Sequence, residues 1–291
     1  LSIPNIYTFY YFSRKGYLTE QALKKWVVVY MMAAVFIFID NKLTTIHVLL
    51  LEGTDVEEVT NNMSYLFVAL IPAVAVFKNN NILQYGLLSF CMIFVVLGMK
   101  RGAVLVGVLS ILYFLNLNFR NHRSISKLKK LAFSILIVLV GVYMVKYMME
   151  TSDFFSQRII ETEEGGSSGR DAIYKVFWNH FKNETDTIKF LFGNGANATL
   201  GIGVNYAHND WLEIAINQGL LGLVVYAFYW LSFYKTIRKT KQNLSAKLVL
   251  TLSFISFFTM TFFSMSYTEY SIFSTTVFGY YLAHCREVEC I

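Results

Sequence analysis

The chain has 291 residues, of which 55% are hydrophobic and only 15% are charged, with two prolines and a formal net charge of +6. A soluble domain of this size carries about 25% charged residues, and the apolar residues here come in blocks with basic connectors between them. The composition therefore excludes a soluble globular domain. Because the basic residues lie beside apolar blocks, they indicate a fixed membrane orientation and contact with lipid, not nucleic acid binding.

Eight apolar segments predict an all-α fold, a polytopic transmembrane helix bundle of about eight spans. In chain order they are Trp26 to about Leu51, Met63–Phe77, Ile82–Gly98, Gly102–Phe119, Leu131–Met149, Trp211–Tyr234, Ala246–Phe263 and Tyr270–Ala283. We expect an interruption of the first span at Asp40-Asn41-Lys42. The chain begins at Leu1 without a signal-peptide pattern, so we expect spans that precede it.

Two connectors rich in Lys and Arg set the predicted orientation. Residues 120–130 and 235–247 each contain five basic side chains and no acid, and an excess of basic residues marks the cytoplasmic side. Counting spans outward from these connectors places residues 1–25, the 78–81 turn and the C-terminus inside, and residues 52–62 and 150–207 outside.

Three regions follow from this count. Residues 1–149 are expected to form N-terminal transmembrane helices, residues 150–207 one long extracytoplasmic loop with short amphipathic helices, and residues 208–291 C-terminal transmembrane helices. A loop of this length needs structure of its own.

The loop contains a predicted amphipathic helix over residues 169–182. Ser168 followed by Asp171 is a capping signal, and apolar or aromatic residues then recur at helical spacing: Ile173, Val176, Phe177, His180 and Phe181. Such a helix lies on the bundle or on the lipid surface. Arg170 in its first turn opposes the helix dipole, which indicates a role other than helix stability.

A glycine-rich segment, residues 192–203, follows that helix. Its glycines at 193, 195, 201 and 203 permit backbone N–H groups to turn toward an anion. The simpler interpretation is a flexible turn, because neither the Lys-Ser/Thr of a phosphate-binding loop nor a preceding strand is present.

His208 is the candidate catalytic residue among the five histidines. It directly precedes a predicted helix that starts on the outside, next to Tyr206 and Asn209. A helix dipole at that place lowers the pKa of an imidazole and keeps it neutral, so that it can accept a proton as a general base.

Asp210 and Glu213 form a cap-like pair at the start of the same helix, with Asp210 as the expected N-cap. We expect capping as their first role and orientation of His208 as a second. Trp211 has the position of an interfacial aromatic anchor. Gly219 and Gly222 allow close helix packing.

Lys100 and Arg101 lie in Gly-Met-Lys-Arg-Gly-Ala, at the predicted outer end of two spans. One interpretation is a tight turn with two basic side chains that extend to the interface; the other is an arginine that faces the bundle and holds an anion. The sequence contains no His, Cys or carboxylate set at metal-ligand spacing and no nucleophilic Ser or Cys motif, so we expect neither a metal, nor another cofactor, nor a covalent intermediate.

Several of these motifs together resemble the O-antigen ligase/polymerase family of bacterial membrane proteins. Lys-Arg-Gly-Ala is similar to the family's Ser-Arg-Gly-Ala, and Ser-Gly-Arg-Asp, Phe-Gly-Asn-Gly, His-Asn-Asp-Trp-Leu-Glu and Gly-Leu-Leu-Gly follow in the family's order between about Asn62 and Tyr234. Lys100 departs from the family's serine, and family members often have ten or more spans.

The resemblance implies a transferase at the outer face of the bacterial inner membrane that acts on glycans carried by undecaprenyl pyrophosphate. It implies His208 as the base and Arg101 and Arg170 as pyrophosphate-binding residues. We add Lys100, the neighbour of Arg101, to the pyrophosphate site and expect Tyr206, Asn209, Asp210 and Glu213 in support. The implied partners are the lipid-linked donor, a glycan acceptor, membrane lipids and, for a polymerase, a chain-length regulator.

Polymerisation of O-antigen, capsule or exopolysaccharide repeat units is the expected activity. Ligation to the lipid A core and protein O-glycosylation are alternatives within the family. A flippase for the same lipid-linked glycan is the alternative from another class, although transporters carry internal repeats and polar groups near the midplane. A non-catalytic component of an envelope complex is a further one, opposed only by the set of His208, Arg101 and Arg170.

Overall fold

The computed structural model describes residues 2–52, 61–78, 80–121, 170–203, 206–240, 243–262 and 271–285, with single positions between 135 and 160. Throughout that part of the chain the regular elements are helices, which confirms the predicted all-α class. The predicted span Leu131–Met149, the cap at Ser168 and most of the loop before it lie outside the described residues.

The chain divides into two compact units. The first comprises residues 1–157, 240–256 and 270–291, and the second comprises residues 158–239 and 257–269. Within the described residues, two helices are long and apolar enough to cross a membrane, Glu20–Leu51 and Asp210–Lys239. Shorter apolar helices cover Ser64–Phe77, Ile82–Leu97, Arg101–Asn116 and Leu244–Met260.

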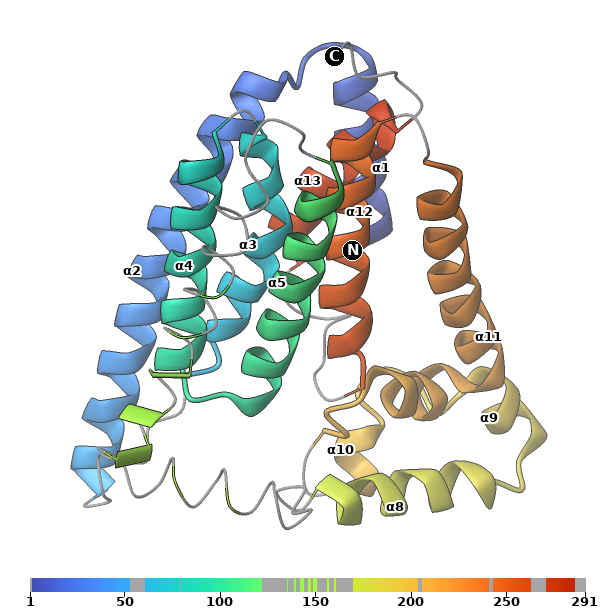
Figure 1. Ribbon diagram of the computed structural model, residues 1–291. Coiled ribbons are helices and arrows are strands. Elements are labelled where there is room, and N and C mark those ends of the chain that lie inside the picture. The colour runs from blue at the N-terminus through green and yellow to red at the C-terminus, as the bar shows by residue number, and fades with distance from the viewer. Residues whose placement is uncertain are drawn as a thin grey trace. The chain divides into compact units, whose positions relative to one another are not determined.

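The first unit is a helix bundle around α3 (Figure 1). Its helices are α1 (Ser2–Arg14), α2 (Glu20–Glu52), α3 (Ser64–Val74), α4 (Asn81–Leu97), α5 (Arg101–Asn121), most of α12 (Leu244–Met260) and α13 (Ser271–His284). Every residue of α3 is buried, and the helix passes into a 3-10 turn over Ala75–Phe77 shortly after Pro72. Because the proline removes one helical hydrogen bond, the short predicted span ends here.

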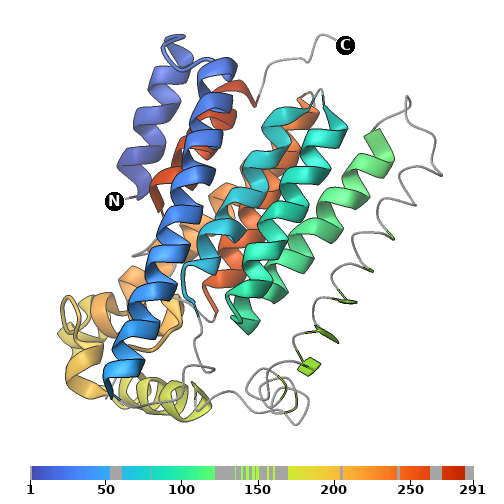
Figure 2. The same ribbon diagram turned by 90° about the vertical axis from the view of Figure 1, so that its left-hand side faces the viewer.

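Helix α2 is continuous, so the predicted interruption at Asp40-Asn41-Lys42 is wrong. Charged side chains on a helix surface leave the backbone ladder intact, and the Thr45 hydroxyl even donates to the Asn41 carbonyl over 2.8 Å. Figures 1 and 2 both show α2 extending beyond α3 and α4 at one end of the unit. The polar triplet therefore lies on a helix surface and does not end an element.

Helix α1 has no counterpart among the predicted spans. Its residues, expected to form part of a cytoplasmic connector, instead pack along α13. A Cβ at Gly279 would lie 2.7 Å from the Ile6 carbonyl oxygen and 2.8 Å from Phe9 Cβ. Glycine at this position thus permits the close approach of the two helices.

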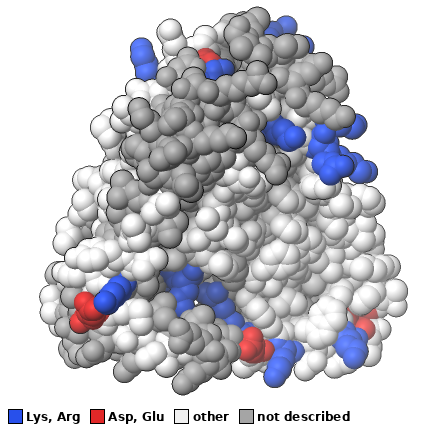
Figure 3. All heavy atoms as spheres, viewed as in Figure 1, with Lys and Arg blue, Asp and Glu red and all other residues white. Residues whose placement is uncertain are grey.

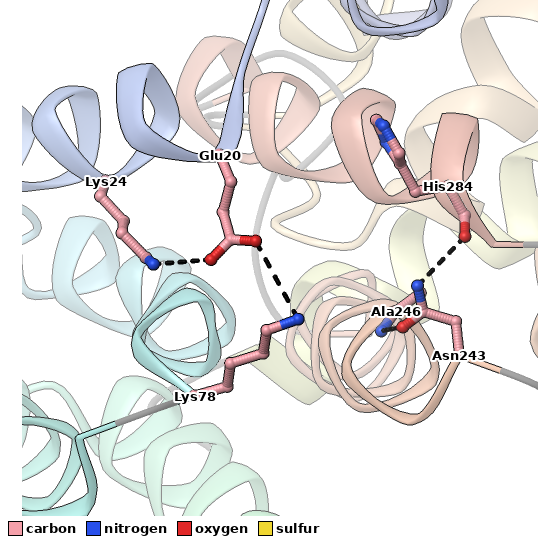
Figure 4. A network of polar contacts seen from close by, with 6 residues as sticks. All are labelled: Glu20, Lys24, Lys78, Asn243, Ala246 and His284. Carbon is pink, nitrogen blue, oxygen red and sulfur yellow. Dashed lines mark hydrogen bonds and ion pairs between the residues drawn. The ribbon is translucent and has the colours of Figure 1, made fainter. Parts of the chain in front are cut away.

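Polar contacts group the segments at one end of the first unit (Figure 4). Glu20 contacts Lys24 at 2.6 Å and Lys78 at 4.0 Å, and the Asn243 side chain donates to the His284 carbonyl over 3.2 Å. Such exposed pairs contribute little stability. They do join segments that the charge count assigns to the same side of the membrane.

The opposite end of the unit holds the turn that precedes Arg101. Asn61 donates its backbone N–H to the Gly98 carbonyl over 2.9 Å and its side-chain amide to the Phe38 carbonyl over 2.8 Å. Met99 has a φ of 51°, and a Cβ at Gly98 would lie 2.5 Å from Ser64 Cβ. The tight turn that the sequence predicts here is therefore packed against the start of α3.

The second unit contains α8 (Arg170–Lys182), α9 (Thr187–Phe192), α10 (Thr199–Ile202) and α11 (Asp210–Lys239), with the last residues of α12. The predicted amphipathic helix is confirmed as α8. Its apolar face supplies Phe177 to a core with Ala207 and Ile216, and Ile173 and Phe181 pack against this core. This face of α8 therefore packs inside the protein, whereas Val176 points outward.

Candidate active site

Helix α11 is broken at Gly219, where φ is 67° and ψ is −165°. Figure 1 shows the first turns of α11 lying across the start of its longer second part. Residues other than glycine rarely adopt this φ. In addition, a Cβ at Gly219 would lie 2.5 Å from the amide nitrogen of Gly193. Asp210–Gln218 is thus a separate short helix, so the predicted span from Trp211 does not run straight through this point.

The glycine-rich segment caps the end of that short helix. The backbone N–H groups of Asn194 and Gly195 donate to the carbonyls of Ile216 and Asn217 over 2.8 and 3.1 Å. These carbonyls lie in a last helical turn, which lacks intrahelical donors. These two amide groups therefore bind a helix end and do not form an anion cradle, and the residues that follow form the expected turn.

The short helix begins with an Asn209 cap. The Asn209 side-chain oxygen accepts from the backbone N–H groups of Trp211 and Leu212 over 3.0 and 3.2 Å, as an N-cap does. Its side-chain nitrogen donates to the Phe262 carbonyl over 3.1 Å. The expectation that Asp210 is the N-cap is wrong, because the residue before it already fills that role.

Asp210 instead joins the two parts of α11. Its carboxylate, 0% exposed, accepts a hydrogen bond of 2.7 Å from the hydroxyl of Tyr226, beyond the break. Its backbone N–H donates to the Thr261 carbonyl over 2.8 Å. A hydrogen bond contributes about 0.5–1.5 kcal/mol net, so this pair helps to hold the angle between the two parts.

Glu213 is the second fully buried carboxylate of the short helix. It accepts from the backbone N–H of Ala207 at 2.6 Å, from the hydroxyl of Thr199 at 2.8 Å and from the side-chain amide of Asn217 at 3.2 Å. The reach back to Ala207 resembles a capping box. Glu213 thereby fixes the peptide that leads into His208.

His208 has a left-handed backbone, with a φ of 50°. A residue other than glycine held in this region costs about 1–3 kcal/mol, and such residues concentrate at functional sites. The hydroxyl of Tyr174, in α8, lies 3.3 Å from the His208 carbonyl oxygen and 3.1 Å from that of Phe262. The partly buried His208 is thus held between the Asn209 cap and Tyr174.

Arg170 lies one helical turn before Tyr174, so both side chains share one face of α8. Burial raises the pKa of the Tyr174 hydroxyl, while the positive charge of Arg170 and a hydrogen bond with Asn209 act in the opposite direction. The second unit therefore brings Arg170, Tyr174, His208 and Asn209 into one neighbourhood.

Trp211 is integrated into the same unit. Its indole N–H donates to the Thr261 hydroxyl over 2.9 Å, and its ring packs against Tyr226 and Phe262 with centroids 5.0 and 6.1 Å apart. Trp211 was expected as an interfacial anchor; its partners show that it connects α11 with the end of α12. Gly222 likewise packs within α11, beneath the side chain of Gln218.

The remaining predicted residues divide between the units. Tyr206, partly buried, directly precedes the Ala207 peptide that Glu213 holds. Lys100 and Arg101, also partly buried, belong to the first unit, where Arg101 begins α5. Over the described residues, no three His, Cys, Asp or Glu side chains gather in a way that could hold a metal ion.

Residues 85–227 match the model of a family described as O-antigen ligase. The chain is an O-antigen ligase/polymerase-family protein. The matched region ends within α11, one residue after Tyr226, and so includes all the residues of the site except Thr261 and Phe262. Neither the curated proteins nor the solved structures that were compared gave a match.

Membership in this family indicates where the protein is located and what type of enzyme it is. The family consists of membrane proteins, and it implies a glycosyltransferase-type enzyme with a lipid-linked glycan donor and an acceptor. His208 and Arg170 lie in the matched region and both belong to the second unit. Arg101 lies in the matched region as well, within the first unit.

Sequence reasoning missed Tyr174, Tyr226 and Thr261. Tyr174 had a detectable signal, because it follows Arg170 by four residues and so shares its helix face. Tyr226 and Thr261 had none: each lies in an apolar segment, and their contacts with Asp210 and Trp211 depend on the break at Gly219.

Proposed function

We propose that the protein transfers an oligosaccharide from undecaprenyl pyrophosphate to a hydroxyl of an acceptor sugar, with His208 as the general base. One observation carries this proposal. The backbone of His208 is left-handed and is bound to Tyr174, which shares a helix face with Arg170. A histidine bound by a residue that shares its helix face with an arginine fits base catalysis at an anionic donor.

In the proposed step, the neutral imidazole of His208 takes the proton of the acceptor hydroxyl. The hydroxyl oxygen then attacks the anomeric carbon of the donor from the face opposite the leaving group. The bond between that carbon and the pyrophosphate oxygen breaks, and its electron pair stays on undecaprenyl pyrophosphate. Because a single displacement occurs, the configuration at the anomeric carbon is inverted, and the reaction needs neither a covalent intermediate nor a metal.

Arg170 is assigned to the pyrophosphate in this scheme. A guanidinium offers planar, paired N–H donors that match phosphate oxygens, and its charge offsets the negative charge that develops on the leaving group. Its place beside Tyr174 supports this role. Arg101 and Lys100 belong to the first unit. The assignment of Arg101 to the pyrophosphate rests on the resemblance of its motif to the family's, and Lys100 is assigned there as its basic neighbour.

The supporting residues act through the position of His208. Asn209 caps the helix that follows His208, and Glu213 holds the peptide that precedes it. Asp210 joins the two parts of α11. With these contacts made in advance, the imidazole needs little reorganisation before proton transfer.

The identity of the acceptor distinguishes two activities that this reaction could serve. Polymerisation of repeat units is one, and a chain-length regulator would then be its partner. The description of the matched family favours the other, ligation to the lipid A core. In both cases we place the protein in the bacterial inner membrane, as a multi-pass protein with His208 at the outer face, where the pyrophosphate of the donor lies.

Product analysis with purified protein tests the proposal. The protein in lipid vesicles receives a lipid-linked oligosaccharide donor together with either a second donor molecule or a lipid A core acceptor, in a buffer containing a chelator. The proposal predicts release of undecaprenyl pyrophosphate and an inverted linkage with one acceptor. Movement of the intact lipid-linked glycan to the opposite leaflet of the vesicle, without a new linkage, would instead indicate a flippase.

A further inference from the structure

Helix α9 has one packed side and one apolar side that is open. Phe190 stacks on Phe181 of α8, with centroids 5.1 Å apart, and Leu191 is partly buried. Ile188 and Phe192 are 71% and 63% exposed, and because they are four residues apart they share one face of the helix. Large apolar side chains with this exposure require a cover other than water.

The break in α11 fixes where α9 lies along that helix. A Cβ at Gly219 would lie 2.6 Å from the carbonyl of Leu191, so the end of α9 touches the point where the second part of α11 begins. From Leu220 to Tyr234, before the basic residues that begin at Lys235, that part supplies about 22 Å of apolar helix at about 1.5 Å per residue, most of the hydrocarbon layer of about 30 Å. With the basic end of this part at one face of the bilayer, Gly219 would lie near the other boundary of the hydrocarbon layer.

The second part of α11 presents lipid-type side chains from this boundary onward. Val225 and Phe228 are 67% and 63% exposed, and Leu221 belongs to the same open surface. Figure 3 shows mostly uncharged side chains over the side of the view where Figure 1 draws this helix, with Lys and Arg toward the upper end of that side. The last turn of α11 contains the basic residues Arg238 and Lys239. The open face of α9 thus adjoins the beginning of a surface suited to acyl chains.

We propose that α9 is an interfacial helix whose Ile188 and Phe192 enter the bilayer leaflet next to Leu221. The adjacent Lys189 and the nearby Lys182 are both exposed, so they are placed to meet anionic phosphate headgroups while the two apolar side chains enter the acyl boundary. The partner of this surface is a phospholipid bilayer with anionic headgroups.

Seating α9 in the membrane also positions the short helix Asp210–Gln218. Asn194 and Gly195, directly after α9, donate to the carbonyls of Ile216 and Asn217. The depth of α9 therefore sets the height of that helix above the bilayer. On the basis of the proposed function, this height places His208 at the level of the donor pyrophosphate.

Site-directed spin labels test the insertion without any transferase assay. Cys91, Cys285 and Cys290 are replaced by alanine, and single labels are introduced by Ile188→Cys and Phe192→Cys in the full chain. Val225→Cys gives the lipid reference, and Asn179→Cys, at an exposed polar position of α8, gives the aqueous reference. The protein is studied in vesicles of phosphatidylethanolamine and phosphatidylglycerol.

Labels at 188 and 192 should collide more with dissolved oxygen than with a water-soluble nickel complex, as the label at 225 does and the label at 179 does not. Water-like behaviour at both positions would overturn the proposal. Dipolar broadening between labels that disappears on dilution with unlabelled protein would also overturn it, because a second copy would then cover the face. Neither result bears on His208, since no glycan transfer is measured.

Discussion

The hydroxyl of Tyr174 lies 3.3 Å from the carbonyl oxygen of His208. The contact joins the first turns of α8, which carry Arg170, to the only described histidine with a left-handed backbone. Tyr174 contacts the backbone carbonyl oxygen of His208, so we assign it a positioning role.

Tyr174→Phe removes the hydroxyl bridge to His208 and Phe262 while keeping the ring. Because one hydrogen bond contributes about 1 kcal/mol net, the expected result is a decrease of about fivefold to tenfold in transfer rate, with normal insertion into the membrane. Initial rates at saturating donor measure the effect. Tyr7→Phe, at an exposed position of α1, is the matched control, and equal rates for the two variants would remove the positioning role.

The stability of the same contact should depend on pH only in the alkaline range. Burial raises the pKa of Tyr174, so the protonated hydroxyl stabilises the fold fully below the unfolded pKa of about 10. This contribution is lost as pH rises through the folded pKa. Thermal unfolding in detergent between pH 8 and 11 should show a smaller alkaline loss for Tyr174→Phe than for the wild type; identical curves would contradict the expectation.

Gly219→Ala should destabilise the second unit. The substitution places a side chain at a φ of 67° and against the backbone of Gly193, and strained backbone of this kind costs about 1–3 kcal/mol. Gly201→Ala in α10 is the matched control, because a Cβ there meets nothing within 4 Å. Denaturation midpoints of the two variants provide the comparison, and equal midpoints would show that the break is not required.

Glu213→Ala should lower both stability and activity. It leaves the buried donors of Ala207, Thr199 and Asn217 without their acceptor, at a cost of about 1–3 kcal/mol for each unsatisfied group. Glu213→Gln keeps one acceptor oxygen and should be less severe. Thermal unfolding ranks the two variants, and a Gln variant as unstable as the Ala variant would contradict the expectation that one retained acceptor oxygen preserves part of the network.

Elements with a strong local signal were predictable from the sequence. The helical spacing of Ile173, Phe177 and Phe181 gave α8, and apolar blocks gave α4, α5 and α12 nearly to their ends. The continuity of α2 through Asp40 was not predictable, because the signal for an interruption was polarity alone. A helix surface accommodates charged side chains wherever the ladder of backbone hydrogen bonds remains complete.

The candidate site was predictable in its residues but not in their contacts. Its neighbourhood around His208 and Arg170 followed from order along the chain and from motif resemblance. The N-cap role of Asn209 in place of Asp210 could not be predicted, because both residue types are good N-caps. The contact that distinguishes them is the hydrogen bond from Tyr226, beyond the break, to Asp210. A glycine in an apolar segment indicates close helix packing as readily as a helix break, so the break at Gly219 could not be predicted.

The transfer rate of His208→Asn tests the central claim most directly. Asparagine tolerates a positive φ better than most residues, so this variant keeps the backbone at 208 and removes the base. With purified protein in vesicles, a lipid-linked donor and its acceptor, the account predicts loss of at least about 100-fold in rate, with wild-type thermal stability. A stable His208→Asn variant with a wild-type rate would contradict His208 as the general base.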